Sequence, residues 1–213
     1  MRIDLHCHTL ASSDCRTKLE IIPEVCRARG IDILAITDHN EIWGAQKLKE
    51  IAPPELNVIV GEEVYTAEGE IIGLYLTELI PRDLTPEETI ERIHAQGGLA
   101  LLPHGFDPLK PSRLQPDARR RVQNQLDIIE GLNGHVSWTG WNARARRWAQ
   151  THDKPASAGS DAHRAEDIGS VYLETPQRLV QTPTDLLEAL SAGQIFGTWR
   201  NPVMSYFRER WAR

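Results

Sequence analysis

The chain has 213 residues, of which 40% are hydrophobic and 25% are charged, as is typical of an ordinary globular protein. Its net charge of −6 argues against a surface that coats nucleic acid, because such surfaces are usually basic. No stretch approaches the roughly 18 apolar residues of a membrane span, no apolar signal segment opens the sequence, and the three cysteines lack paired spacing. We therefore expect a cytoplasmic protein that forms no stable complex with nucleic acid or with membranes.

Short apolar runs alternate with helical patterns along most of the chain. Runs rich in leucine and β-branched residues predict strands over residues 2–6, 31–37, 57–66, 71–76, 99–104, 126–130, 155–160 and 171–173. Helical patterns predict helices over residues 19–29, 42–51, 87–96, 115–123, 138–151 and 184–192. Thr85 and Thr182 each precede a proline and stand three residues before an acid, which predicts a helix start at both places. This alternation predicts a mostly parallel sheet, either open or closed into a barrel.

Residue types that bind metal ions stand at the ends of several of these strands. His6 and His8 are two residues apart, so both face one side of the first strand while Cys7 faces the other. Asp38, His39, Glu63, His104, Asp161 and His163 stand at or near the ends of later strands. Functional groups of α/β barrels gather where strands end, so one site supplied by many strands favours a closed barrel over an open sheet.

In their order along the chain, these motifs resemble those of the PHP (polymerase and histidinol phosphatase) family. They are His6-Cys7-His8-Thr9, Ser13-Asp14, Thr37-Asp38-His39-Asn40, Gly61-Glu62-Glu63, Pro103-His104 and Gly159-Ser160-Asp161-Ala162-His163. The resemblance covers residues 1 to about 171 and implies a single-domain α/β protein, a distorted (β/α)7 TIM-like barrel, to which a C-terminal helix and tail (residues 182–213) are added. It also implies a phosphoesterase that uses two or three divalent metal ions, manganese, iron or zinc.

The resemblance further implies which residues bind each ion. The ligands of the first ion are His6, His8 and Asp161. Glu63 bridges the first ion to a second, which His104 also binds. The ligands of the third ion are Asp14, His39 and His163. Glu62, one residue before Glu63, is expected to point to the opposite face of its strand.

Glu70 stands where family members often carry a further histidine ligand of the second ion. It is either a ligand in place of that histidine or an exposed turn residue. As a ligand, a carboxylate would shift the preference of the second site toward harder ions such as manganese and ferrous iron.

The implied reaction is hydrolysis of a small phosphate ester, with a metal-bridged hydroxide as the nucleophile. Nucleotide and sugar phosphates are the natural substrates, and a short oligonucleotide is a further one. Candidate substrate contacts are Arg16, Asn133, His135 and Arg164, while Lys18 and Arg113 are further basic residues in nearby loops. Asp4 and Asp38 are candidates to orient ligand imidazoles.

Three alternative functions stay open from the sequence. One is histidinol-phosphate phosphatase, although its members tend to be longer than this chain. Another is metal-assisted amide or ring hydrolysis, for which the metal-bridging lysine of amidohydrolases has no obvious counterpart. The third is a non-catalytic, metal-stabilised PHP interaction domain, although such domains often lose ligands that this chain keeps. Metal content and activity on p-nitrophenyl phosphate would separate these classes.

Overall fold

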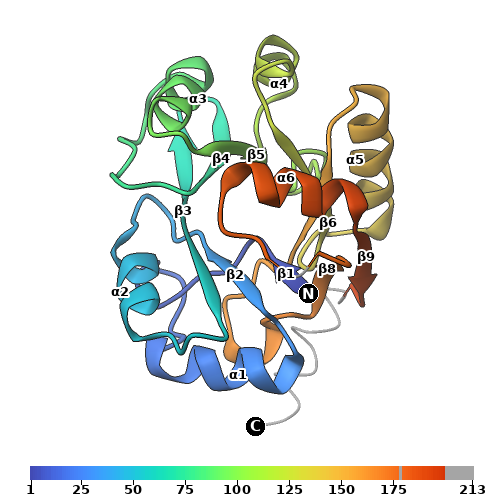
Figure 1. Cartoon of the computed structure of the whole chain (residues 1–213). Helices are drawn as coiled ribbons and strands as arrows, with labels where there is room; N and C mark the ends of the chain where they lie inside the picture. The colour runs from blue at the N-terminus through green and yellow to red at the C-terminus, as the bar shows by residue number, and fades with distance from the viewer. Residues whose placement is uncertain (178, 200–213) are drawn as a thin grey trace, which may run out of the picture.

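A curved sheet forms the frame of the molecule (Figure 1). The structure is a computed structural model that describes residues 1–177 and 179–199. The strands within these ranges are β1 (Arg2–Asp4), β2 (Ile33–Ile36), β3 (Asn57–Thr66), β4 (Gly69–Leu74), β5 (Leu99–Leu102), β6 (Ile128–Asn133), β7 (Ala156–Gly159), β8 (Val171–Glu174) and β9 (Gln194–Gly197). The helices are α1 (Ile22–Arg29), α2 (Trp43–Ile51), α3 (Pro86–Ala95), α4 (Pro116–Val122), α5 (Thr139–Thr151) and α6 (Pro183–Ala192), with short 3-10 turns at Leu19–Ile21 and Ala165–Asp167.

The sheet curls into a nearly closed barrel, as expected from the sequence. Its strand order is β7-β6-β5-β4-β3-β2-β1-β8-β9. The free edge of β7 then meets the chain that continues from β1, because the amide of Leu5 donates to Ala158 O (3.0 Å) and the amide of His8 to Ala162 O (3.0 Å). Parallel pairing therefore continues past the end of the short first strand.

The expectation of a mostly parallel sheet holds for only part of the barrel. β1 to β3 and β5 to β7 pair in parallel, whereas β4 is antiparallel to both of its neighbours and β8 is antiparallel to β1. Thr66 pairs with Gly69, so only two residues join β3 to β4, too few for the crossover that a parallel pair needs. β9, which has no counterpart among the predicted strands, follows α6 and pairs antiparallel with β8.

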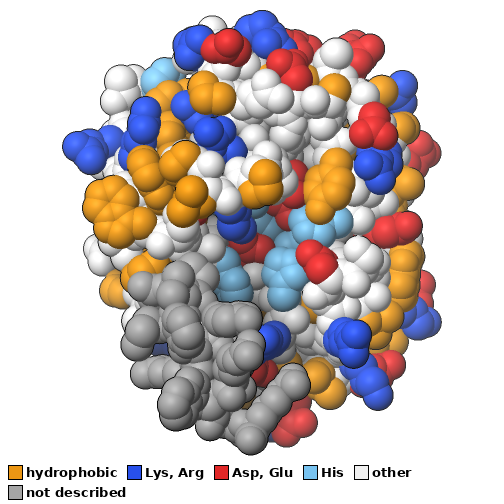
Figure 2. Space-filling model, turned by 180° about the vertical axis from the view of Figure 1, so that it is seen from behind, with side chains coloured by type: hydrophobic (Ala, Val, Ile, Leu, Met, Phe, Trp, Pro, Cys, Tyr) orange, Lys and Arg blue, Asp and Glu red, His pale blue; other side chains and the backbone are white. Residues whose placement is uncertain are grey.

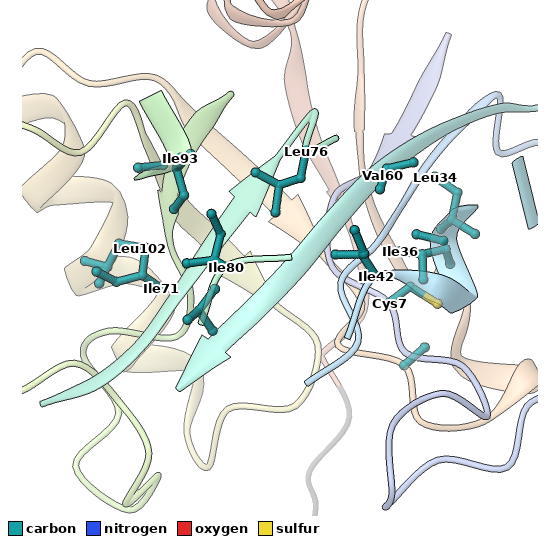
Figure 3. Close-up of a cluster of buried hydrophobic side chains, with 14 of the residues drawn as sticks. Cys7, Leu34, Ile36, Ile42, Val60, Ile71, Leu76, Ile80, Ile93 and Leu102 are labelled. Atoms are coloured by element: carbon teal, nitrogen blue, oxygen red, sulfur yellow. The ribbon is translucent and has the colours of Figure 1, made fainter. Parts of the chain in front are cut away.

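Apolar side chains pack on both faces of the sheet. Inside the barrel, Ile33 belongs to one cluster with Leu186 and Leu190 of α6. Leu34 and Ile36, which alternate with inward-facing residues of β2, belong to the outer cluster beneath the helices, part of which Figure 3 shows. Full burial of a leucine contributes roughly 1.5–3 kcal/mol, so both layers stabilise the barrel.

Helix α6 covers the end of the barrel where the parallel strands begin, and Figure 1 shows it lying across them. Asn57, the first residue of β3, donates from Nδ2 to Val180 O (2.6 Å) just before this helix.

The predicted helix starts at Thr85 and Thr182 are confirmed, because each threonine side chain accepts a hydrogen bond from the amide three residues on. The predicted C-terminal tail falls partly on residues 200–213, which lie outside the described residues. None of the described helices combines the length and apolar composition that a membrane span requires.

Candidate metal centre

Imidazoles and carboxylates gather at the end of the barrel opposite α6. Figure 2, seen from behind the view of Figure 1, shows a hollow in which histidines lie beside acidic and basic side chains. Five of the eight histidines of the sequence lie in this cluster: His6, His8, His39, His104 and His163. Because they follow β1, β2, β5 and β7, the barrel brings together residues that are far apart in the sequence.

His6 and His8 converge, as their spacing predicts. Their Nε2 atoms are 3.1 Å apart, while Cys7 is buried in the outer apolar cluster. Asp161 Oδ1 lies 3.6 and 3.5 Å from these two nitrogens, and Glu63 Oε2 lies 3.2 and 3.4 Å from them. Four ligand atoms held about 2.1 Å from one ion stand about 3.4 Å apart at tetrahedral angles. These four atoms therefore have the spacing of one coordination sphere.

A second group of donor atoms includes the other oxygen of Glu63. His104 Nε2 lies 3.0 Å from Glu63 Oε1 and 3.5 Å from Glu70 Oε2. Glu70 is only 2% exposed and belongs to β4, so it is not an exposed turn residue. His39 Nδ1 also faces this group, 3.2 Å from Glu63 Oε2 and 3.8 Å from Glu70 Oε1.

The third group lies nearer to the surface. Asp14 Oδ2 is 3.5 Å from His39 Nε2 and 3.3 Å from His163 Nε2, and the Asp14 side chain is 49% exposed. The ring of His8 stacks on that of His163, with centroids 4.2 Å apart. The three side chains expected to bind a third ion are therefore neighbours, and His8 reaches the same place.

The register of β3 separates its two adjacent glutamates, as expected. Glu63 points into the barrel, where its two oxygens contact the first two groups of donor atoms. Glu62 points into the outer layer, where Oε2 accepts a hydrogen bond from the amide of Ile80 (2.8 Å). Burial raises the pKa of Glu62 to about 8, which keeps this carboxyl group protonated near neutral pH.

Several buried polar atoms of the cluster lack hydrogen-bond partners in the part of the chain that the structure describes, and they suit the coordination of divalent cations. His39 Nδ1 and Glu70 Oε2 are buried, yet neither makes a hydrogen bond within the described residues. Buried polar atoms are normally hydrogen-bonded, so such atoms call for a ligand. Imidazole nitrogens and carboxylate oxygens are the donor types that zinc, iron and manganese accept. The side chains present therefore suit a centre with several metal ions.

The electrostatics of the cluster point the same way. Burial alone would raise the pKa values of Glu63 and Asp161, but neighbouring cationic groups, His6 for both and Lys110 for Asp161, lower them well below the usual range. Burial and the charge of Glu63 raise the pKa of Glu70 to about 8. Two carboxylates this close repel each other when both are ionised, and bound cations would relieve that repulsion.

Glu130, in the middle of β6, orients the imidazole of His6, a predicted metal ligand. Glu130 Oε1 lies 2.9 Å from His6 Nδ1, and Oε2 accepts a hydrogen bond from the amide of His104 (2.6 Å). A carboxylate on the far nitrogen of a ligand histidine fixes the ring and raises its basicity. We expected this role for Asp4 and Asp38 instead, and for Asp4 the expectation is wrong, because its carboxylate accepts hydrogen bonds from backbone amides.

Asp38 acts on His8 through an intermediate side chain. Its Oδ1 accepts hydrogen bonds from the amide of Thr9 (2.6 Å) and the hydroxyl of Ser12 (2.9 Å). Ser12 Oγ in turn lies 3.1 Å from His8 Nδ1. Asp38 therefore holds the loop after β1 and, through Ser12, the ring of His8.

Two of the predicted ligands have left-handed backbone conformations. The φ angles of His104 and Asp161 are +27° and +54°. Short hydrogen bonds from their amides hold them there: the amide of Asp161 donates to the backbone oxygen of His6 (2.7 Å), and that of His104 donates to the side-chain Oε2 of Glu130 (2.6 Å). Such conformations cost non-glycine residues free energy and cluster at functional sites.

Lys110 reaches the centre, although no motif in the sequence pointed to it. Its Nζ forms an ion pair with Asp161 Oδ2, and Asn133 Nδ2 donates to the same oxygen (3.1 Å). Burial alone would lower the pKa of Lys110, but Asp161 and neighbouring carboxylates raise it. The only available signal was its position a few residues after His104, in the loop between β5 and α4.

The four predicted substrate contacts, Asn133, His135, Arg16 and Arg164, differ in burial and in their neighbours. Asn133 is buried, and its side chain also donates to Glu130 (3.0 Å). The ring centroid of His135 lies 6.3 Å from that of His163, and burial lowers the pKa of His135. Arg16 and Arg164 are exposed in loops that also carry predicted ligands. Their contact with substrate stays a prediction, as it does for Lys18 and Arg113.

Two family models match the chain. The PHP domain model matches residues 4–136, and the model of a PHP-associated region matches residues 139–195. The uncharacterized protein MJ0417 of Methanocaldococcus jannaschii is 31% identical over 189 residues, which cover 87% of this chain and 75% of that protein.

Solved structures share the fold. PsfC from Pseudomonas syringae has a TM-score of 0.73 at 19% identity, with 100% of this chain and 98% of that chain covered. A two-domain protein of Bacteroides vulgatus containing a predicted PHP-like metal-dependent phosphoesterase has a TM-score of 0.70 at 18% identity. This chain is covered over 92% of its length but spans only 64% of that protein. With the PHP model matching more than half of its residues, the chain belongs to the PHP domain family.

Proposed function

We propose that the protein is a metal-dependent phosphoesterase that hydrolyses small phosphate esters such as nucleotide or sugar phosphates, with short oligonucleotides as further substrates. The observation that carries the proposal is the convergence of five histidines and several carboxylates on one open end of the barrel. Family membership supports the use of metal ions there.

The charges of the predicted ligands suit an anionic substrate. Divalent ions in such a centre lower the pKa of a bound water to about 7 and neutralise the charge of a phosphate ester. The predicted ligand carboxylates are Asp14, Glu63, Glu70 and Asp161, which together contribute −4. With three divalent ions the centre would carry a net charge of +2, which attracts phosphate even in a protein whose net charge is −6.

The surrounding residues would keep the ligands in place during the reaction. Glu130 and Ser12 hold the far nitrogens of His6 and His8, so neither ring can turn away. Asn133 binds both Glu130 and Asp161 and thereby fixes the inner ligand carboxylate. Preorganised ligands of this kind lower the free energy needed to arrange the centre around a substrate.

Lys110 bears on the amidohydrolase alternative. The sequence offered no obvious counterpart of the metal-bridging lysine, yet a lysine does reach the centre. As an ammonium paired with Asp161, however, Lys110 is a cation, whereas a metal-bridging ligand must be anionic or have a free lone pair. A cation beside the predicted ligands favours a phosphate ester over a neutral amide.

The test is hydrolysis by protein that has been stripped with a chelator and reloaded with manganese, iron or zinc. We expect release of p-nitrophenol from p-nitrophenyl phosphate and of phosphate from several nucleotide and sugar phosphates, with little activity before reloading. Histidinol phosphate belongs in the same panel, since strong selectivity for it would favour the narrower alternative. Fully loaded protein that is inactive on every ester would favour a metal-stabilised interaction domain instead.

A further inference from the structure

Hydrogen bonds hold the loop around Lys110 on both sides of this residue. Its amide donates to Asp107 O (3.3 Å), and its own carbonyl accepts from the amide of Arg113 (3.2 Å). The carboxylate of Asp107 accepts hydrogen bonds from the amide (2.5 Å) and hydroxyl (2.7 Å) of Ser137, in the loop after β6. The loop after β5 is thus tied to the loop after β6, and the lysine is directed into the hollow between them.

The contact between Lys110 and Asp161 leaves the metal-facing oxygen of the carboxylate free. Asp161 Oδ1 is the oxygen that lies near His6, His8 and His163, at 3.5–3.6 Å. Lys110 binds the other oxygen, Oδ2. The ammonium therefore does not occupy the predicted position of an ion, and both cations can be present together.

The ammonium also has unused hydrogen-bonding capacity. A lysine ammonium carries three N–H donors. Within the described part of the chain, Asp161 is the only hydrogen-bond acceptor assigned to Nζ, and the side chain is 24% exposed. Its remaining donors are therefore available to a group that enters the hollow from solvent.

We propose that Lys110 is a further substrate-binding residue, which donates a hydrogen bond to a phosphate oxygen that the metal ions do not hold. This inference rests on the proposed phosphoesterase function and adds a residue that neither the motifs nor the family resemblance supplied. Lysine binds phosphate as a point charge, so the contact requires a cation at this position and little directional precision. Asp161 anchors the ammonium beside the centre before substrate arrives.

The experiment measures binding of inorganic phosphate to manganese-loaded wild-type protein and to Lys110→Met, Lys110→Arg and the matched control Lys47→Met. Lys47 is an exposed lysine of α2 that pairs with Glu50, and it is neither a predicted metal ligand nor a predicted substrate contact. Isothermal titration gives the dissociation constant for phosphate, and elemental analysis gives the metal stoichiometry of each protein. A hydrogen bond to a charged group contributes about 1.5–3 kcal/mol, which corresponds to a roughly 10- to 100-fold change in affinity.

We expect Lys110→Met to keep the wild-type metal stoichiometry and melting temperature but to bind phosphate roughly 10- to 100-fold more weakly. Lys110→Arg should retain most of the affinity, and Lys47→Met all of it. With p-nitrophenyl phosphate, Lys110→Met should raise KM by a similar factor.

Two results would overturn the inference while leaving the proposed function intact. One is a phosphate affinity in Lys110→Met within about twofold of wild type. The other is loss of metal from Lys110→Met, which would make Lys110 merely a counterion that supports Asp161. If loaded wild-type protein neither binds phosphate nor hydrolyses any ester, the proposed function itself fails, and the role of Lys110 fails with it.

Discussion

At one end of the barrel α6 buries Leu186 and Leu190 among the starts of the strands, whereas at the other end the strands finish in imidazoles and carboxylates. The first end gains free energy mainly from apolar burial. The second brings ionisable groups together at the cost of desolvation and repulsion. Apolar packing therefore stabilises the α6 end, while we expect the opposite end to need bound cations. The two ends should respond differently to substitution.

The largest effect should come from the carboxylate shared by the first two ligand groups. Glu63→Gln removes a charge that faces both groups, so we expect the loss of at least one metal ion per chain and a fall of about 10³-fold or more in kcat/KM. Glu62→Gln is the matched control, because Glu62 is protonated near neutral pH and an amide reproduces its neutral form. Elemental analysis and phosphatase assays measure both. Equal sensitivity of the two positions would contradict the register of β3.

The α6 end should show the opposite pattern. Leu186→Ala leaves a cavity in the inner apolar cluster, and we expect the free energy of unfolding to fall by about 2–5 kcal/mol. The number of bound metal ions should not change. Urea denaturation of the metal-free protein measures the first quantity, with Leu109→Ala, at a position that is 75% exposed, as the control. A loss of metal in Leu186→Ala would mean that the two ends are coupled.

Metal removal tests the dependence of the second end on cations. At a metal concentration 100 times the dissociation constant, binding adds about 2.7 kcal/mol to the stability of the folded state. For a chain of this size we expect chelation to lower the melting temperature by roughly 5–10 °C. Glu63→Gln should show a much smaller shift in differential scanning calorimetry. An unchanged melting temperature in the wild type would argue against cation dependence.

We expect a smaller effect from Glu130, whose carboxylate contacts His6 Nδ1. Glu130→Gln keeps the size of the side chain but removes the charge that orients the imidazole, so metal affinity should fall roughly 10- to 100-fold. Competition with a fluorescent chelator measures this affinity. Glu174, an exposed residue of β8 that pairs with Arg2 of β1, provides the control, and Glu174→Gln should leave the metal affinity unchanged.

The finest distinction concerns Glu70 and the identity of the second ion. Glu70→His should keep a bound metal but shift the preference toward zinc, because imidazole is a softer ligand than carboxylate. Glu70→Ala should weaken the second site selectively and leave the site of His6, His8 and Asp161 occupied. Metal competition between manganese and zinc, followed by elemental analysis, reads out both variants. Unchanged stoichiometry and activity in Glu70→Ala would exclude a ligand role.

Local patterns in the sequence predicted most of the barrel. All eight predicted strands and six predicted helices have counterparts in the structure, and the alternation within residues 57–66 correctly assigned Glu62 and Glu63 to opposite faces. β9 was missed because a four-residue strand next to glycine has too short a pattern. The direction of β4 was missed because strand–helix alternation says nothing about a strand that returns through a two-residue turn.

The residues that contact and orient the predicted ligands were harder to predict. His6 and Glu130 are 124 residues apart in the sequence, and Lys110 and Asp161 are 51 apart, so their contacts exist only once the barrel has closed. No periodicity or cap marks such a pair. Asp4 and Asp38 are sequence neighbours of the ligands and were therefore the more obvious candidates to orient them, although the backbone amides nearby compete for their carboxylates.

The left-handed backbone at His104 and Asp161 has a consequence for how this protein could change under selection. Glycine adopts such conformations without penalty, so at both positions it would relax the main chain while deleting a side chain of the metal centre. Glycine at either position would therefore relieve backbone strain but remove a predicted ligand, and with it the stability that a bound ion supplies. Variants with a higher melting temperature should be sought elsewhere, for instance around α6, where stability and activity do not compete.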